Sequence, residues 1–117
     1  MSSLAAERCQ ACHGRVPPLT RDGAQALLGD LAEGWTILGD VLSRRFTAPD
    51  FLTAFALATS VALVAEREGH HPDLLVGWGY LEIRLTTHAA AGLTRNDFII
   101  AAKVDQLVAA KAAAPGS

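Results

Sequence analysis

Two matching helix-start signals, each preceded by a pair of strand-like runs, limit the folds open to this chain. In the first signal, Thr47 and Asp50 have the spacing of a capping box, and Pro49 suits the first turn because its missing N–H would have no helical partner. Thr94 and Asp97 repeat the capping spacing near the end of the chain. Apolar pairs that can staple a helix start flank each box: Phe46 with Phe51, and Leu93 with Phe98. Each signal therefore predicts a helix that directly follows two strands.

The periodicity of the apolar residues predicts three helices and four strands. The predicted helices are residues 21–31 behind an N-cap at Thr20, a long helix from the first signal to Gly69, and a final helix that ends near Ala113. The predicted strands are residues 35–38, 41–46, 74–78 and 80–87. This order favours an α+β fold in which a single four-stranded antiparallel sheet carries three helices packed on one face.

The same periodicity predicts which residues are buried. In the last strand, Leu81, Ile83 and Leu85 alternate with polar residues, so one face of the strand should be buried and the other hydrated. The residues expected on one face of the long helix are Phe51, Ala54, Phe55, Ala58, Val61, Ala62 and Ala65. Those expected mostly on one side of the final helix are Ile99, Ala102, Val104, Leu107 and Val108. Apolar residues also surround much of the long helix, so we expect a homodimer or homotetramer.

Length and charge limit the class of protein. The chain of 117 residues is long enough for one domain, at residues 20–113, after an irregular lead-in at residues 1–19 and before a short tail at residues 114–117. A formal net charge of −2 argues against nucleic acid as the main partner, because proteins that bind nucleic acid usually carry a basic patch. The apolar runs are too short to cross a membrane, and residues 1–15 lack the apolar core of a secretory signal. We therefore expect a cytoplasmic protein with a small-molecule or protein partner.

The lead-in contains a CxxC motif, Cys9 and Cys12, with His13 beside it. A redox-active CxxC usually opens a helix in a thioredoxin-like pattern, and no such pattern surrounds this one. A structural zinc ion needs four ligands. We interpret the cysteine pair as inert or locally structural, with a metal or redox role shared between subunits as the alternative.

Three of the four histidines, His70, His71 and His88, lie in one stretch of the chain. Imidazole donates and accepts protons near neutral pH because its unperturbed pKa is about 6.5. His70 and His71 follow the end of the long helix, where Pro72 favours a bend that could turn both side chains toward one pocket. His88 ends the last strand on its polar side or at the rim of the sheet. If these two segments meet, three imidazoles converge on one site for proton transfer.

Each of these residues also has a purely structural interpretation. A histidine pair after a helix can interact with the helix dipole, and His88 alone would be a surface residue at a strand end. Asp97 can serve as a helix cap, Trp78 as a core residue or pocket wall, and Glu66 as a solvated residue. The spacing of the whole set is what favours a functional interpretation.

The set comprises Glu66, His70, His71, Pro72, Trp78, His88 and Asp97. With this spacing, the chain closely resembles the pterin-4a-carbinolamine dehydratase family, and the similarity covers about residues 20–112. A His-His-Pro sequence alone would be weak evidence, whereas the full set across residues 66–97 is a specific match. The lead-in resembles an extension found in some bacterial members.

The resemblance implies a hydro-lyase that removes water from 4a-hydroxytetrahydropterin to give the quinonoid dihydropterin. It would thereby recycle the pterin cofactor of aromatic amino acid hydroxylases. An acid should protonate the hydroxyl that leaves C4a and a base should remove the proton on N5, and imidazoles can do both without a metal or an organic cofactor. By similarity, His70 and His88 act as the acid and the base, and His71 positions the substrate hydroxyl or shares the proton transfer. Asp97 would hold a histidine or the substrate. The remaining substrate-binding residues expected are Trp78, Pro72 and Thr87.

Three other functions stay open at this point. Some animal members of the family are dimerisation partners of a transcription factor, so a non-catalytic dimerisation or transcriptional cofactor module is one alternative. A second is metal binding, because three histidines are the protein ligands of some catalytic zinc sites. A third is a pterin-handling role in molybdenum-cofactor metabolism.

Overall fold

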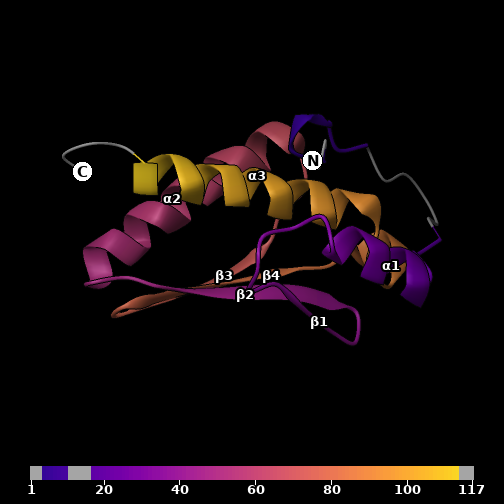
Figure 1. Ribbon diagram of the computed structural model, residues 1–117, viewed down its shortest axis with the longest axis horizontal. Helices are drawn as coiled ribbons and strands as arrows, with labels where there is room; N and C mark the ends of the chain where they lie inside the picture. The colour runs from indigo at the N-terminus through magenta and orange to yellow at the C-terminus, as the bar shows by residue number, and fades with distance from the viewer. Residues whose placement is uncertain (1–3, 11–16, 114–117) are drawn as a thin grey trace.

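The computed structural model describes residues 4–10 and 17–113, which form one sheet covered by helices on a single face (Figure 1). The strands are β1 (Thr36–Leu38), β2 (Val41–Thr47), β3 (Asp73–Gly77) and β4 (Tyr80–Leu85). The helices are α1 (Arg21–Leu28), α2 (Phe51–Glu68) and α3 (Arg95–Ala113), with short 3₁₀ helices η1 (Leu4–Ala6) and η2 (His88–Ala90). The sheet order is β1-β2-β4-β3, and every neighbouring pair is antiparallel. The predicted fold class is confirmed.

The alternation predicted for the last strand decides which side of the sheet the helices cover. Leu81, Ile83 and Leu85 of β4 are fully buried under the helices. Glu82 and Arg84 lie on the opposite, open face and form an ion pair there. The sheet is therefore two-sided, with an apolar helix-bearing face and a polar open face.

The first half of α3 is the centre of the core. Phe98, Ile99, Ile100 and Val104 are almost completely buried, because this half packs against α2, α1 and η1 above the sheet. The sequence predicted that the apolar residues of this helix lie mostly on one side. In the first half of α3, buried residues lie on several sides. A helix surrounded by other elements on several sides needs apolar residues around its whole circumference.

The start of α2 differs from the prediction. Asp50, not Thr47, is the N-cap, and its carboxylate accepts the N–H of Thr53 at 2.7 Å. Thr47 instead continues β2, where it pairs with Tyr80 of β4. The strand pairing is therefore favoured over a capping box at Thr47, and α2 begins three residues later than predicted.

Only part of the predicted α2 face is buried. Ala54, Ala58, Val61 and Ala65 pack into the core, together with Val64. The members of the predicted face that are exposed are Phe51, Phe55 and Ala62. Phe51 stacks on Phe55 at 6.1 Å between ring centroids, whereas Phe46 meets Trp35 edge-on in the core.

Two other elements, α1 and β4, end earlier than predicted, and α2 ends where predicted. α1 ends at Leu28 because Gly29 follows it and the next residues form tighter turns. β4 ends at Leu85, where the chain turns toward η2. The predicted stop at Gly69 is confirmed, since its φ of 68° is left-handed and its N–H bonds to the carbonyl of Ala65 at 2.9 Å. None of the described helices has the length and apolarity needed to span a membrane.

Candidate active site

A buried carboxylate holds His70 in place. Nε2 of His70 lies 2.6 Å from Oδ1 of Asp97. The side chain of His70 is 11% exposed and that of Asp97 is 0% exposed. His70 directly follows Gly69, the C-cap of α2, and Asp97 lies in the first turn of α3, so the contact joins two helix ends. Because Nε2 faces Asp97, Nδ1 is the ring nitrogen of His70 that remains for a substrate.

The second oxygen of Asp97 is also fully used. Oδ2 accepts the backbone N–H of Thr94 at 2.9 Å and the hydroxyl of Thr87 at 2.8 Å. Since Thr87 donates its one hydroxyl proton to Asp97, the hydroxyl of Thr94 donates to Thr87, at 2.8 Å. The bond to Thr94 is one half of the predicted capping box. Asp97 therefore caps α3 with one oxygen and orients His70 with the other.

His71 lies in a more open position than His70. Its Nε2 is 2.6 Å from Oε1 of Glu66, but the two side chains are 60% and 74% exposed. An exposed pair of this kind contributes at most about 1 kcal/mol to stability. Glu66 is thus a solvated residue that touches the outer histidine of the pair.

His88 is exposed and lies in η2. The loop that follows η2 is held by contacts with residues 17–19. The N–H of Leu19 bonds to the carbonyl of Leu93 at 2.7 Å. Pro18 packs so closely on Gly92 that a Cβ at position 92 would lie 2.9 Å from the Pro18 Cβ. A glycine is therefore needed at position 92 for residues 17–19 to hold this loop.

The three histidines line one open cleft with a volume of about 260 Å³. Its other lining residues are Gln10, Gly69, Thr86, Thr87, Ala89 and Asn96. The volume lies just below the roughly 300–1,000 Å³ of pockets for drug-sized ligands, so the cleft suits a compact ring system. The fold thus brings together His70, His71, His88 and Thr87, four of the residues expected at the site.

Pro72 and Trp78 are not among the described residues that line this cleft. Trp78 lies in the β3–β4 turn and is 74% exposed. Because β3 separates it from His70 and β4 separates it from His88, it lies roughly 15 Å or more along the hairpin from the histidines. Figure 1 shows this turn at the same end of the molecule as the start of α2. Within one chain, Trp78 is therefore not a wall of the cleft.

Three polar residues of the cleft were not foreseen, namely Gln10, Thr86 and Asn96. Thr86 and Asn96 are each next in sequence to a residue of the predicted site, which was a usable signal. No local pattern marks Gln10, because it follows a short 3₁₀ turn in a segment without apolar periodicity. Its position at the cleft depends entirely on where the lead-in docks.

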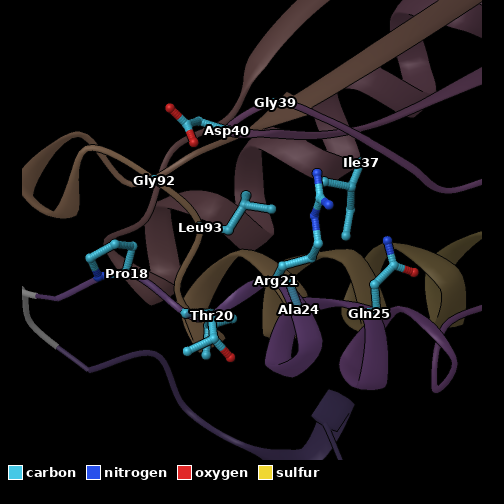
Figure 2. Close-up of a pocket in the computed structure, with 11 residues that line it drawn as sticks. Pro18, Thr20, Arg21, Ala24, Gln25, Ile37, Gly39, Asp40, Gly92 and Leu93 are labelled. Atoms are coloured by element: carbon cyan, nitrogen blue, oxygen red, sulfur yellow. The ribbon is translucent and has the colours of Figure 1, made fainter.

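A larger cavity of about 500 Å³ lies between α1, the β1–β2 turn and the loop after η2 (Figure 2). Figure 2 shows Arg21 and Gln25 of α1 on one side of it and Ile37 and Leu93 on another. Its titratable lining groups among the described residues are Arg21 and Asp40. No histidine lines this cavity among the described residues, so the smaller histidine cleft is the better candidate for acid–base chemistry.

The cysteine motif is only partly described. Cys9 is half-buried, and its Sγ lies 3.7 Å from the carbonyl oxygen of Asn96. Cys12 and His13 lie outside the described residues, so the interpretation of the pair stays a prediction. Among residues 4–10 and 17–113, no three His, Cys, Asp or Glu side chains are grouped to hold a metal ion.

Fold and site together define a class of protein: an α+β domain with a small cleft lined by three histidines. Comparison with known proteins narrows this class. The family model for pterin 4 alpha carbinolamine dehydratase matches residues 17–107. The chain therefore belongs to the pterin-4a-carbinolamine dehydratase family, and the reaction in that name, loss of water, is that of a hydro-lyase.

Individual relatives agree with this assignment. A protein of Halorhodospira halophila, provisionally named pterin-4-alpha-carbinolamine dehydratase, is 44% identical over 107 residues, covering 90% of this chain and 97% of its own length. A relative of the same name from Nitrosomonas eutropha is 43% identical and covers 90% of this chain and 93% of its own.

Two solved structures are also similar. The crystal structure of a transcriptional coactivator/pterin dehydratase from Brucella melitensis superposes with a TM-score of 0.72 at 30% identity, over 77% of this chain and 97% of the other. A pterin dehydratase-like protein described as a RuBisCO assembly factor in the alpha-carboxysome gives a TM-score of 0.54 at 28% identity, over 64% and 89%. The predicted family and enzyme class are confirmed.

Proposed function

We propose that this chain dehydrates 4a-hydroxytetrahydropterin to the quinonoid dihydropterin in the cleft lined by His70, His71 and His88. The observation that carries the proposal is the convergence of three imidazoles on one small cleft, one of them fixed by a buried carboxylate. Family membership supports the substrate class.

His70 is the candidate base. With Asp97 ionised, the Nε2–H of His70 donates to Oδ1, which leaves the lone pair of the neutral ring on Nδ1. That lone pair can take the proton from N5 of the pterin. Asp97 would then stabilise the imidazolium that forms, because the carboxylate is held by its bonds to Thr87 and Thr94 and cannot turn away.

His88 is the candidate acid. It enters the cleft from a different segment of the chain, so it can act on another atom of the substrate. In its protonated form it would donate to the hydroxyl on C4a, so that the C–O bond breaks with loss of water. One proton is delivered and one is removed, so the reaction balances without an added cofactor. His71 would position the hydroxyl or return protons from solvent.

The test is a direct assay of the purified protein. With 4a-hydroxytetrahydropterin generated in the cuvette, we expect formation of the quinonoid dihydropterin to be faster than the spontaneous reaction. The double variant His70→Ala/His88→Ala serves as the control and should return the rate to the spontaneous one. A wild-type rate equal to that of buffer, with a stable protein partner found instead, would favour the binding-module alternative.

We further propose that the pterin is the cofactor of an aromatic amino acid hydroxylase. The support is the family's reaction, because a 4a-hydroxytetrahydropterin is left when a tetrahydropterin that has added O2 at C4a transfers one of the two oxygen atoms to the aromatic substrate. Deletion of the gene should then slow growth on phenylalanine as the sole carbon source in a host that carries the hydroxylase. Unimpaired growth would count against this physiological role.

We also propose that the chain is a homo-oligomer that associates through the outer side of α2. Leu52 and Leu63 are 74% and 61% exposed, and Phe55 between them is 51% exposed. These three residues recur at helical spacing, and Leu52 is two and a half turns from buried Val61, so they form a stripe opposite the core face. An apolar stripe of this kind on a soluble domain usually marks an interface.

Phe55→Glu should convert the oligomer to a smaller species. Placing a charge in an apolar interface is unfavourable, and because Phe55 is half-exposed in the single chain, the fold itself should tolerate the change. Light scattering coupled to size-exclusion chromatography measures the outcome, with Gln106→Glu on the exposed side of α3 as the control. A wild-type protein that is already monomeric, or a Phe55→Glu oligomer of unchanged mass, would contradict the assignment.

A further inference from the structure

The N-terminal strap, which we define as residues 4–10, is docked firmly on α3. Leu4 is buried in the core against this helix. Arg95 binds the carboxylate of Glu7 through two nitrogens, at 2.8 and 2.6 Å. Lys103 donates from Nζ to the carbonyl of Ala5 at 2.8 Å. The strap is thus part of the folded domain, although the sequence indicated only an irregular lead-in.

Glu68, at the end of α2, anchors the middle of the strap. Oε1 accepts the N–H of Cys9 at 2.8 Å, and Oε2 lies 3.0 Å from Nε of Arg8. Burial opposes the ionisation of Glu68, but the bonds from Cys9 and Arg8 and the charge of Lys103 outweigh it and hold its pKa below the ordinary 4.5. Glu68 is therefore ionised when the strap is docked at neutral pH.

The last residue of the strap is fixed at the cleft by its main chain. The N–H of Gln10 donates to Oδ1 of Asn96 at 2.9 Å, and Nδ2 of Asn96 donates to the carbonyl of Gln10 at 2.7 Å. Asn96 is buried in the first turn of α3, next to Asp97, which holds His70. Adjacent residues of one helical turn therefore position both Gln10 and His70 at the same cleft.

We infer that Gln10 is a substrate-contacting residue that recognises the pyrimidine edge of the pterin. A primary amide offers one acceptor oxygen and two N–H donors, which match the carbonyl and ring N–H of that edge. The carbon of this carbonyl, C4, is bonded directly to C4a, so a group that lines the cleft beside the histidines is well placed for it. The inference rests on the proposed function, and it assigns to the strap a role in substrate affinity.

The test is a comparison of Gln10→Ala with the wild type. The two bonds between the main chain of Gln10 and Asn96 do not use the Gln10 side chain, so they should persist in the variant, and its unfolding temperature is measured alongside. We expect the KM for 4a-hydroxytetrahydropterin to rise roughly 3- to 10-fold, as for loss of one hydrogen bond, with kcat nearly unchanged. The Kd for 7,8-dihydropterin, a stable analogue of the product, should rise by a similar factor in a fluorescence titration.

Gln25→Ala is the matched control, because Gln25 is an exposed glutamine that lines the other cavity. It should bind 7,8-dihydropterin as the wild type does. Wild-type KM and Kd values in Gln10→Ala, with an active wild type, would overturn the inference and leave the proposed function intact. A rise in KM that comes with a lower unfolding temperature would also overturn it, since Gln10 would then act only through strap docking. A wild type that neither dehydrates nor binds pterin would overturn both.

Discussion

His70→Ala is expected to lower the turnover of carbinolamine dehydration by roughly 10²-fold or more, the usual contribution of a positioned acid or base. The reason is geometric: His70 lines the cleft and is also held at 2.6 Å by a buried carboxylate. The measurement is kcat under saturating substrate. Because His70 is mostly buried, circular dichroism should confirm that the variant is folded.

Glu66→Gln is the matched control for this experiment. Glu66 belongs to the same sequence motif, but it is exposed and touches only the outer histidine, His71, among the contacts described. Its replacement should change kcat only slightly. Equal losses in the two variants would show that motif membership, and not the His70–Asp97 geometry, predicts catalytic importance. Wild-type turnover in His70→Ala would refute the assigned role.

Asp97→Ala is expected to lower the free energy of unfolding by about 3–5 kcal/mol, because a buried donor that loses its acceptor costs about 1–3 kcal/mol and Asp97 serves three of them. Truncation leaves Nε2 of His70, the Thr94 N–H and the Thr87 hydroxyl without their acceptor in the protein interior. For a domain of this size the midpoint of thermal unfolding should fall by about 10 °C or more.

Asp97→Asn separates the structural role of Asp97 from its role at the cleft. The amide oxygen can still accept from Thr94 and Thr87, so much of the stability should remain. The amide nitrogen then faces Nε2 of His70 and donates to it, which places the ring proton on Nδ1. His70 could no longer accept a proton from the substrate through Nδ1, so kcat should fall by roughly 10²-fold although the fold is kept.

Asp105→Asn controls for the loss of a carboxylate from the same helix. Asp105 is nearly buried and binds Trp35 and Arg44, at 2.8 and 3.0 Å, away from the cleft. Its replacement should lower stability without a selective loss of kcat. If Asp97→Asn kept full turnover, the tautomer argument for His70 as the base would fail.

The histidine motif shows how far prediction from sequence could go for the site. The spacing of His70, His71 and His88 predicted one shared site, and the fold places all three at one cleft. Trp78 belongs to the same spacing pattern, yet it lies at the opposite end of the β3–β4 hairpin from the histidines. A motif records which residues occur together, but it carries no information on how far apart a hairpin holds them.

The fold was predictable where the deciding interactions join neighbouring residues. The stop of α2 at Gly69 depends on a bond to Ala65, and the buried side of β4 depends on strict alternation. The predicted start of α2 was wrong because Thr47 pairs instead with Tyr80, which lies on β4, much further along the sequence. Local signals are reliable until a distant segment offers the same backbone a better set of hydrogen bonds.

Helix starts, strand alternation and the histidine spacing can all be read from the order of residues, because each is a relation between positions a few steps apart. The orientation of His70 by Asp97, 27 positions away, and the docking of Gln10 on Asn96, 86 positions away, exist only because α2 and the N-terminal strap pack on α3. Such contacts leave no periodicity in the sequence. They arise from the packing of a shared core, and this packing is what brings His70 and Gln10 to one cleft.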